Sequence, residues 1–284
     1  MSTENRVLRT ILVPTDFSEV AHQAYIYALH FAEQFQTSIV LLHVYQDISV
    51  AQGVAPEGFV ESLRAARVHE AATRFDRYQQ EVQQEIDHEI EVSSLIRAGT
   101  PVDQILSVAQ EHEVGMIIMG TMGAESMAEK ILGSVTTRVI DLAACPVLAI
   151  PFQMVYEPIQ HILYATNFEE DDLQVIDQLL DYAAVFGARV SCVHIQTQGS
   201  QWNRLDRSVF EKVYQLERDQ ESVTFYTLNE NDIVAGLQRF VAANRVDLMA
   251  MLCHQRSMMN RLYHESLTRE MTLHTSVPLL AFHF

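Results

Sequence analysis

RTILVPTDFS, at residues 9–18, returns 151 residues later as QHILYATNFE, at residues 160–169. Each copy begins as a short apolar run, which suits a buried strand, and ends in polar residues, which suit a turn. An amphipathic pattern follows each copy, at residues 21–35 and 173–186, so a helix is expected after each strand. This order of strand, turn and helix occurs twice and predicts a chain built from two similar halves.

The repeat continues through further apolar runs in each half. SIVLLHVY begins at Ser38 and RVSCVHIQ at Arg189, again 151 residues apart. VGMIIMG at residues 114–120 matches VDLMAML at residues 246–252, now 132 residues apart. CPVLAIPF and SVPLLAFHF then end the two halves. The change of offset places 19 extra residues in the first half before its fourth strand.

The extra residues fall within 46–91, where a loop at 51–58 precedes a long helical pattern at 59–84. Strands that are apolar on both faces and alternate with helices indicate a parallel sheet covered on both sides. The sequence therefore predicts two doubly wound α/β domains, at 1–152 and 159–284, joined by a short polar connection between Pro151 and Pro158.

The composition of the chain narrows the range of functions that it can have. The chain has 284 residues, which suits two domains, and a net charge of −18 spread over both halves. Nucleic acid is not an expected partner, because a phosphate backbone requires a basic face. Three cysteines, each inside an apolar run, indicate a reducing compartment. We expect a cytoplasmic protein with no membrane partner, because neither a signal peptide nor a membrane-length apolar run is recognised.

A glycine pattern follows the fourth strand of the first half. Gly120 and Gly123 are followed, after a spacer of nine residues, by Gly133 and Ser134, and a helical pattern then runs to Leu142. Glycines let backbone N–H groups approach an anion, and Ser134 is expected to be the helix N-cap beside a phosphate. The first strand ends near Asp16, on the edge where ligands of doubly wound sheets bind, so its carboxylate could accept ribose hydroxyls.

These residues resemble the ATP-binding signature of the universal stress protein family, in its tandem two-domain form. The resemblance extends to PTDFS at residues 14–18 and to Leu42-His43-Val44, and through the repeat it covers the whole chain. It implies a Rossmann-like fold of the adenine nucleotide alpha hydrolase type, two five-stranded sheets with strand order 3-2-1-4-5. It also implies ATP or a related adenine nucleotide as ligand, with Mg2+ as an optional companion. The implied binding residues are Pro14, Thr15, Asp16, Val44, Gly120, Gly123, Gly133, Ser134, Val135 and Thr136.

The second half departs from this signature. Leu252, Gln255 and Glu265 stand at the positions of the three glycines, and Asn167 replaces Asp16. A carboxylate at the expected phosphate position repels a polyphosphate, so we predict no family-type ATP site in this half.

Simpler interpretations stay open at several positions. The glycines could serve tight turns, and Asp16 could be the N-cap of the first helix. His43 and His194 recur at one strand position, which favours a packing or hydrogen-bonding role in both halves. Cys253-His254, with histidines further on, matches no compact metal spacing, so neither catalytic nor metal-binding residues are assigned.

The function expected from the resemblance is regulatory, in a stress response, through a nucleotide bound to the first half. The second half would serve a pseudo-dimer or interaction role, with the last strands of the halves paired. A homodimer or another protein partner stays open. The alternatives are a scaffold that needs no nucleotide and a slow ATPase, since no convincing general base is present.

Overall fold

The computed structural model describes residues 8–46, 57–82, 89–121, 133–169, 171–197, 223–253, 270–271 and 275–283. The chain divides into two compact units, Met1–Cys145 and Pro146–Phe284. The strand β5 (Val147–Ile150) falls in the second unit. The domain bounds expected from the sequence, 1–152 and 159–284, place this strand in the first domain, and they remain a prediction.

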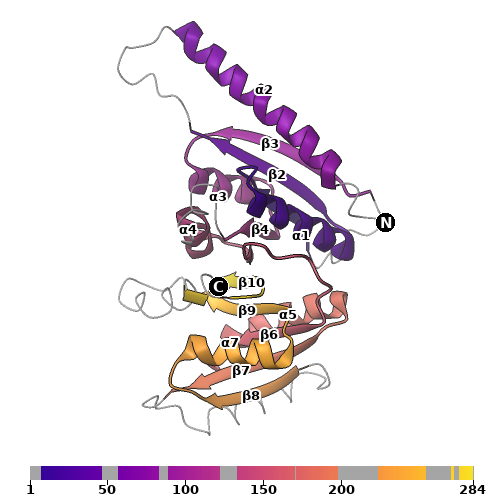
Figure 1. Ribbon diagram of the computed structural model, residues 1–284, viewed down its shortest axis with the longest axis vertical. Coiled ribbons are helices and arrows are strands. Elements are labelled where there is room, and N and C mark those ends of the chain that lie inside the picture. Colours follow the sequence, from indigo (N-terminus) through magenta and orange to yellow (C-terminus); the bar gives the residue numbers. More distant parts are fainter. Residues whose placement is uncertain are drawn as a thin grey trace. The chain divides into compact units, whose positions relative to one another are not determined.

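The first unit alternates strands with helices (Figure 1). Its strands are β1 (Thr10–Pro14), β2 (Ser38–Tyr45), β3 (Val92–Ala98) and β4 (Met116–Gly120). Its helices are α1 (Glu19–Phe35), α2 (Glu57–Val82), α3 (Pro101–Glu111) and α4 (Ser134–Leu142). The strands lie in the order β3-β2-β1-β4 and pair in parallel.

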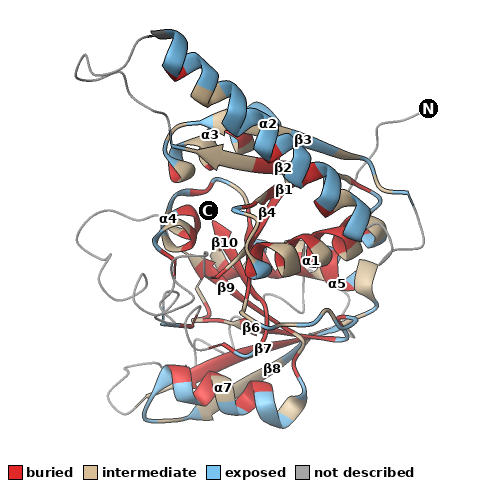
Figure 2. Ribbon diagram, turned by 45° about the horizontal axis from the view of Figure 1, so that its top comes forward, coloured by how far each residue is buried: buried red, intermediate tan, exposed pale blue. Residues whose placement is uncertain are grey.

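The helices of this unit lie on two faces of the sheet. Parallel crossovers are right-handed, so the connections from β1 to β3 put α1 and α2 on one face, and the reversed path puts α3 and α4 on the other. Tyr25 of α1 stacks on Tyr78 of α2 at 5.2 Å between ring centroids, and α3 contacts α4. Figure 2 shows β1 and β4 buried while much of α2 is exposed. The core thus lies under α1 and around the two central strands.

The second unit completes the predicted order. Its elements are β5, β6 (His161–Ala165), α5 (Asp171–Phe186), β7 (Arg189–Gln196), β8 (Val223–Asn229), α7 (Ile233–Asn244), β9 (Leu248–Cys253) and β10 (Leu279–His283). Read from β8, five of its strands lie in the order β8-β7-β6-β9-β10, which is the order 3-2-1-4-5, and they pair in parallel. With β3-β2-β1-β4 in the first unit, this confirms the predicted α/β fold and strand order.

The strand β10 also pairs antiparallel with β5, Leu280 lying opposite Leu148. The two runs that close the halves of the repeat therefore lie side by side, as the family resemblance implied. Pairing covers a strand edge that would otherwise expose unpaired backbone groups.

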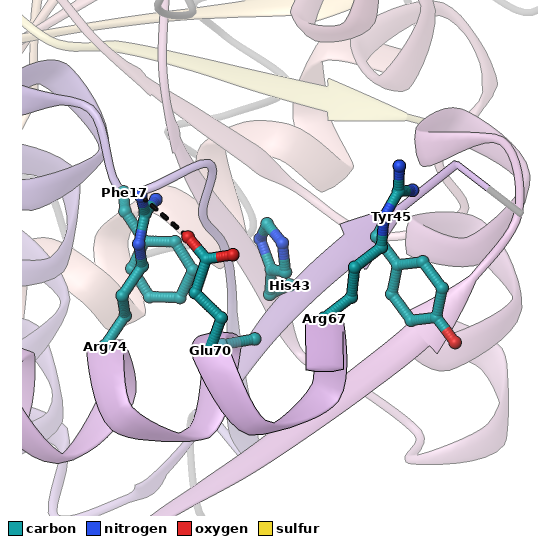
Figure 3. Close-up of a pocket in the computed structure, with 7 residues that line it drawn as sticks. Phe17, His43, Tyr45, Arg67, Glu70 and Arg74 are labelled. Carbon is teal, nitrogen blue, oxygen red and sulfur yellow. Dashed lines mark ion pairs between the residues drawn. The ribbon is translucent and has the colours of Figure 1, made fainter. Parts of the chain in front are cut away.

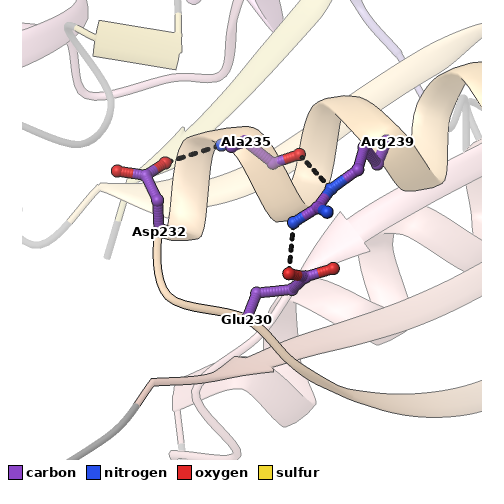
Figure 4. Close-up of polar contacts among 4 residues, drawn as sticks. All are labelled: Glu230, Asp232, Ala235 and Arg239. Carbon is purple, nitrogen blue, oxygen red and sulfur yellow. Dashed lines mark hydrogen bonds and ion pairs between the residues drawn. The ribbon is translucent and has the colours of Figure 1, made fainter.

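Helix α7 shows how local sequence sets an element boundary in this unit (Figure 4). The carboxylate of Asp232 accepts from the Ala235 N–H at 2.7 Å and caps the helix. Arg239, one turn later, forms an ion pair with Glu230 on the preceding chain. These contacts fix the direction in which the chain leaves β8.

Candidate functional site

The strand order of the first unit turns back between β1 and β4. These strands are parallel neighbours, with Leu12 opposite Ile117, so their carboxyl ends meet at one edge of the sheet. In doubly wound sheets this edge is where ligands bind. The residues that follow β1 and those that end β4 include the site residues predicted from the sequence. The edge that they form is called the switch edge below.

The turn after β1 is held by its own side chains. Thr15 donates its N–H to the Leu42 carbonyl at 2.8 Å, and its hydroxyl accepts from the Phe17 N–H at 2.9 Å. Asp16 accepts from the Ser18 N–H at 3.0 Å, while Phe17 takes a left-handed φ of 61°. Thr15 is buried and Asp16 is exposed. The turn therefore presents the Asp16 carboxylate at the surface of the switch edge.

Asp16 is not the N-cap of α1. Ser18 has that role, because its hydroxyl accepts from the Ala21 N–H at 3.3 Å. The alternative that Asp16 caps the helix was wrong by two residues, since the extended turn moves the helix start to Glu19. The Asp16 carboxylate instead braces the turn from outside the helix.

Gly120 is explained by packing. A Cβ at this position would lie 2.4 Å from Cγ1 of Val20 in α1, far closer than two carbon atoms approach. The absence of a side chain at Gly120 thus lets α1 lie directly on the end of β4. This gives Gly120 a structural role whatever ligand the edge binds.

The start of α4 also differs from the expectation. Gly133 is the N-cap and Ser134 is the first helical residue, so the prediction that Ser134 caps the helix was wrong by one position. The reason is a backbone bond, in which Gly133 donates its N–H to the Thr121 carbonyl at 2.9 Å and holds the chain against β4. Ser134 is exposed on the first turn.

Thr136 ties the same turn to β4. Its hydroxyl is buried and donates to the Gly120 carbonyl at 2.8 Å. The first bond of α4 runs from the Thr137 N–H to the Gly133 carbonyl, so the N–H groups of Ser134, Val135 and Thr136 precede the helical ladder. Such N–H groups and the positive end of the helix dipole favour an anion at this place.

Val44 lies two residues beyond Leu42, which pairs with Pro14 at the end of β1. The Leu42 carbonyl points towards β1, where Thr15 donates to it, and the Tyr45 carbonyl points towards β3, where Gly99 donates to it at 2.9 Å. Backbone groups alternate in direction along a strand, so those of Val44 point to the side of β1. Since β1 ends at Pro14, the Val44 N–H and C=O face the switch edge, where a planar base with a donor and an acceptor could pair with them.

Helix α2 brings an aromatic cluster to this edge. The ring of Phe17 packs against His43, Phe75 and Tyr78, at 4.8, 5.2 and 5.8 Å between ring centroids. Burial is the main cause that holds the pKa of the Tyr78 phenol far above its usual value, and the Asp16 carboxylate adds to the rise. The sequence interpretation did not assign Tyr78 a role. The buried stripe of Ala71, Phe75, Tyr78 and Val82 at helical spacing is the signal that could have found it.

The second unit repeats the turn without the exposed acid. Thr166 accepts from the Phe168 N–H at 2.9 Å, and Nδ1 of His194 donates to the Thr166 carbonyl at 2.9 Å. His43 makes the same bond to the Thr15 carbonyl at 2.9 Å, so the expected common role of the two histidines is confirmed. Asn167 holds the place of Asp16.

A buried carboxylate also distinguishes this unit. Asp172 accepts from the Tyr164 hydroxyl at 2.5 Å, the Thr166 hydroxyl at 2.7 Å and the Glu169 N–H at 2.9 Å. Burial, and then the charge of Asp172, raise the pKa of Tyr164 well above its usual value. The repeat has Ala21 at the position of Asp172, so the two units fill the base of this turn differently.

Some of the residues on which the sequence predictions rest lie outside the described residues. This holds for Gly123 in the first half, and for Gln255 and Glu265 in the second. Among the described residues, no group of three or more histidines, cysteines or acids could hold a metal ion, and no helix is long and apolar enough to cross a membrane. Cys145, Cys192 and Cys253 are thiols and not parts of disulfides.

A model of the universal stress protein family matches residues 8–151. The chain belongs to this family. A curated relative, universal stress protein MJ0577 from Methanocaldococcus jannaschii, is 32% identical over 155 residues, which cover 50% of this chain and 94% of the relative. The YxiE universal stress protein of Bacillus subtilis is 27% identical over 146 residues, 49% of this chain and 97% of the relative.

A solved structure matches both halves together. It is a universal stress protein from Archaeoglobus fulgidus, with a TM-score of 0.69 at 18% identity and 96% of each chain covered. At this identity the likeness concerns the fold. It extends the family resemblance in architecture beyond residue 151, where the family model ends.

Proposed function

We propose that this chain is a stress-response regulator that binds ATP or a related adenine nucleotide at the switch edge of its first half. The observation that carries the proposal is the start of α4. Gly133 and Thr136 anchor this helix to the end of β4, and the N–H groups of Ser134 and Val135 precede the helical ladder there. Such a helix start, at the point where strand order reverses, suits a phosphate group.

The remaining residues suit the nucleoside. The Val44 backbone would pair with the base, and the exposed Asp16 carboxylate would accept hydrogen bonds from ribose hydroxyls. Pro14 ends β1 and thereby leaves room beside Val44. Thr15 shapes the turn from its buried position. Gly123, with Gly120 and Gly133, completes the family signature for the phosphates.

A bound Mg2+ would take its ligands mainly from phosphate oxygens and water. This ion commonly keeps several waters and uses few protein carboxylates at nucleotide sites. Asp16 is the acid that the structure exposes on the turn after β1. A role in binding is favoured over fast hydrolysis, because the Thr15 and Thr136 hydroxyls and Nδ1 of His43 already contact the protein's own backbone.

The second half would serve in interaction. Antiparallel pairing of β10 with β5 supports this role, since it gives the closing strand of the second half a structural partner. Asn167 in place of Asp16, and Glu265 in place of Gly133, argue against a second ATP site of the same type. A scaffold that needs no nucleotide is the second candidate, and the same strand pairing supports it.

Calorimetric titration with ATP and Mg2+ tests the proposal, with Ser134→Glu as the deciding variant. A carboxylate in the first turn of α4 suits the helix dipole and so preserves folding, but it repels a phosphate at the helix start. We expect ATP affinity to fall at least tenfold, which is about 1.4 kcal/mol or more. Gln80→Glu, which adds the same charge on an exposed position of α2, is the matched control and should bind ATP as the wild type does.

A second variant tests the nucleoside side. Asp16→Asn keeps an oxygen that can accept from the Ser18 N–H, and it copies the residue found in the second half. Adenosine affinity should fall while the unfolding temperature stays the same. Absence of ATP binding by the wild type, or unchanged binding by Ser134→Glu, would leave the scaffold as the better account.

A further inference from the structure

A separate cavity of about 200 Å³ lies between α2 and the end of β2 (Figure 3). His43 and Tyr45 line it from the strand, and Phe17 lines it from the turn after β1. Side chains alternate between the faces of a strand, so His43 and Tyr45 point to the face opposite that of Val44. The cavity is therefore distinct from the backbone edge proposed for the nucleotide.

One wall of this cavity is made of rings. Phe17 and His43 lie 4.8 Å apart between centroids and are tilted by 40°. Nδ1 of His43 donates to the Thr15 carbonyl, which fixes the orientation of the ring. Figure 3 shows His43 between Glu70 and Arg67, with Tyr45 beyond it. A planar, apolar ligand can stack on such a wall.

The opposite wall carries positive charge. Arg67, Glu70 and Arg74 are spaced by three and four residues, so α2 presents them on one face together with the small Ala71. Arg67 donates one Nη to the Gln46 carbonyl at 2.7 Å, which positions a guanidinium that has further donors. Arg74 lies over the Phe17 ring at 5.4 Å and pairs with Glu70 at 3.2 Å. Two cations thus face one acid, in a chain whose net charge is −18.

Among the described residues, the second unit has the same pair of rings, and they are more deeply buried there. Phe168 and His194 lie 5.2 Å apart between centroids with the same 40° tilt, and the histidine bond to the turn is also the same. However, His194 is only 5% exposed and Phe168 only 8%, whereas His43 and Phe17 are partly exposed. Gln196 stands where the first unit has Tyr45. The shared turn therefore does not by itself leave its two rings open to solvent.

We propose that this cavity binds a small planar anion, an aromatic carboxylate, with its ring on Phe17 and His43 and its carboxylate on Arg67. The volume suits one ring and is below the range of roughly 300–1,000 Å³ usual for larger ligands, which excludes a whole nucleotide. A guanidinium pairs with a carboxylate through two parallel hydrogen bonds, and Arg67 has the donors for them. The inference does not depend on nucleotide binding at the switch edge.

Ligand-detected NMR with benzoate tests it on the full-length protein. Saturation transfer to benzoate should be saturable, and benzamide, which has the same shape and no charge, should bind at least tenfold more weakly. Arg67→Gln should weaken benzoate binding about tenfold, because it removes the charge but keeps an amide that can reach Gln46. Arg77→Gln, at an exposed position of the same helix outside the cavity, is the matched control and should bind normally.

Two further measurements separate this site from others. Ala71→Leu fills the cavity from α2 and should abolish the benzoate signal while circular dichroism shows a folded protein. Saturating ATP should leave the signal unchanged. The proposal is overturned if the wild type shows no saturable binding up to about 10 mM benzoate, a very weak affinity. It is equally overturned if Arg67→Gln and Arg77→Gln behave alike, if Ala71→Leu still binds, or if ATP displaces benzoate.

Discussion

Replacing Gly120 with alanine tests whether this glycine is needed for packing. The added Cβ would lie 2.4 Å from Cγ1 of Val20 and 3.2 Å from the Val20 carbonyl carbon. Carbon atoms prefer about 3.5–4.0 Å, so rotation of the Val20 side chain cannot remove the whole overlap. Helix α1 must move away from β4, and Val20 is fully buried at this contact.

The expected cost follows from that overlap. Overpacking a filled core costs about 1–3 kcal/mol, against which alanine regains about 0.4–1 kcal/mol by restricting the unfolded chain. We therefore expect the free energy of unfolding of the first unit to fall by about 1–2 kcal/mol. With a urea dependence of about 2 kcal/mol per molar, the midpoint falls by about 0.5–1 M.

The assay is urea unfolding followed by pulsed hydrogen exchange, analysed on peptides from α1 and β4 so that the first unit is measured separately. Gly58→Ala is the control. A Cβ at Gly58 would meet nothing within 4 Å, so this variant should be neutral or slightly stabilised. Val20→Ala removes the methyl groups that clash, so combining it with Gly120→Ala should show a coupling of at least about 1 kcal/mol.

A coupling below about 0.5 kcal/mol would refute the packing argument, since distant and independent sites add within that range. The same would follow if Gly120→Ala left the urea midpoint unchanged. Gly120 would then have to be explained by the ligand alone.

Three other outcomes are expected. Thr136→Val should lower the free energy of unfolding by about 1–2 kcal/mol, because the partly buried Gly120 carbonyl loses its donor. Ser134→Ala, at an exposed position, should change it by less than about 0.5 kcal/mol, and thermal unfolding measures both. Burial lowers the pKa of His161 in the folded protein below its usual 6.5. The contribution of His161 to stability is therefore present above pH 6.5 and is lost as the pH falls through the pKa of the folded state. A titration midpoint at or above 6.5, measured by NMR of the imidazole, would contradict this. Burial raises the pKa of Cys145 to about 11. Iodoacetamide should therefore alkylate Cys145 at pH 8 about 100-fold more slowly than it alkylates the same thiol in the unfolded chain, and mass spectrometry of the alkylated peptide measures the rate.

The linear sequence was sufficient for four strands of each half, although it assigned no run of residues to β3 or β8. Runs such as SIVLLHVY and RVSCVHIQ became β2 and β7 with the expected bounds, because a buried parallel strand needs continuous apolar residues. The 151-residue offset predicted the shared turn, which reappears with the same hydrogen bonds at Thr15 and Thr166. These features depend on local pattern, which a repeat makes visible twice.

The sequence alone also indicated that residues after β1 and at the end of β4 would lie at the switch edge, since the carboxyl ends of parallel strands meet there. What each does was decided by tertiary contacts. Gly120 is explained by the approach of Val20, which lies 100 residues away in the chain, and the bond between Gly133 and Thr121 shifted the cap of α4 by one position. The cavity under α2 was not foreseen, because its walls come from separate elements. Side-chain packing between distant segments leaves no local pattern, and only the folded chain brings Phe17, His43 and Arg67 together.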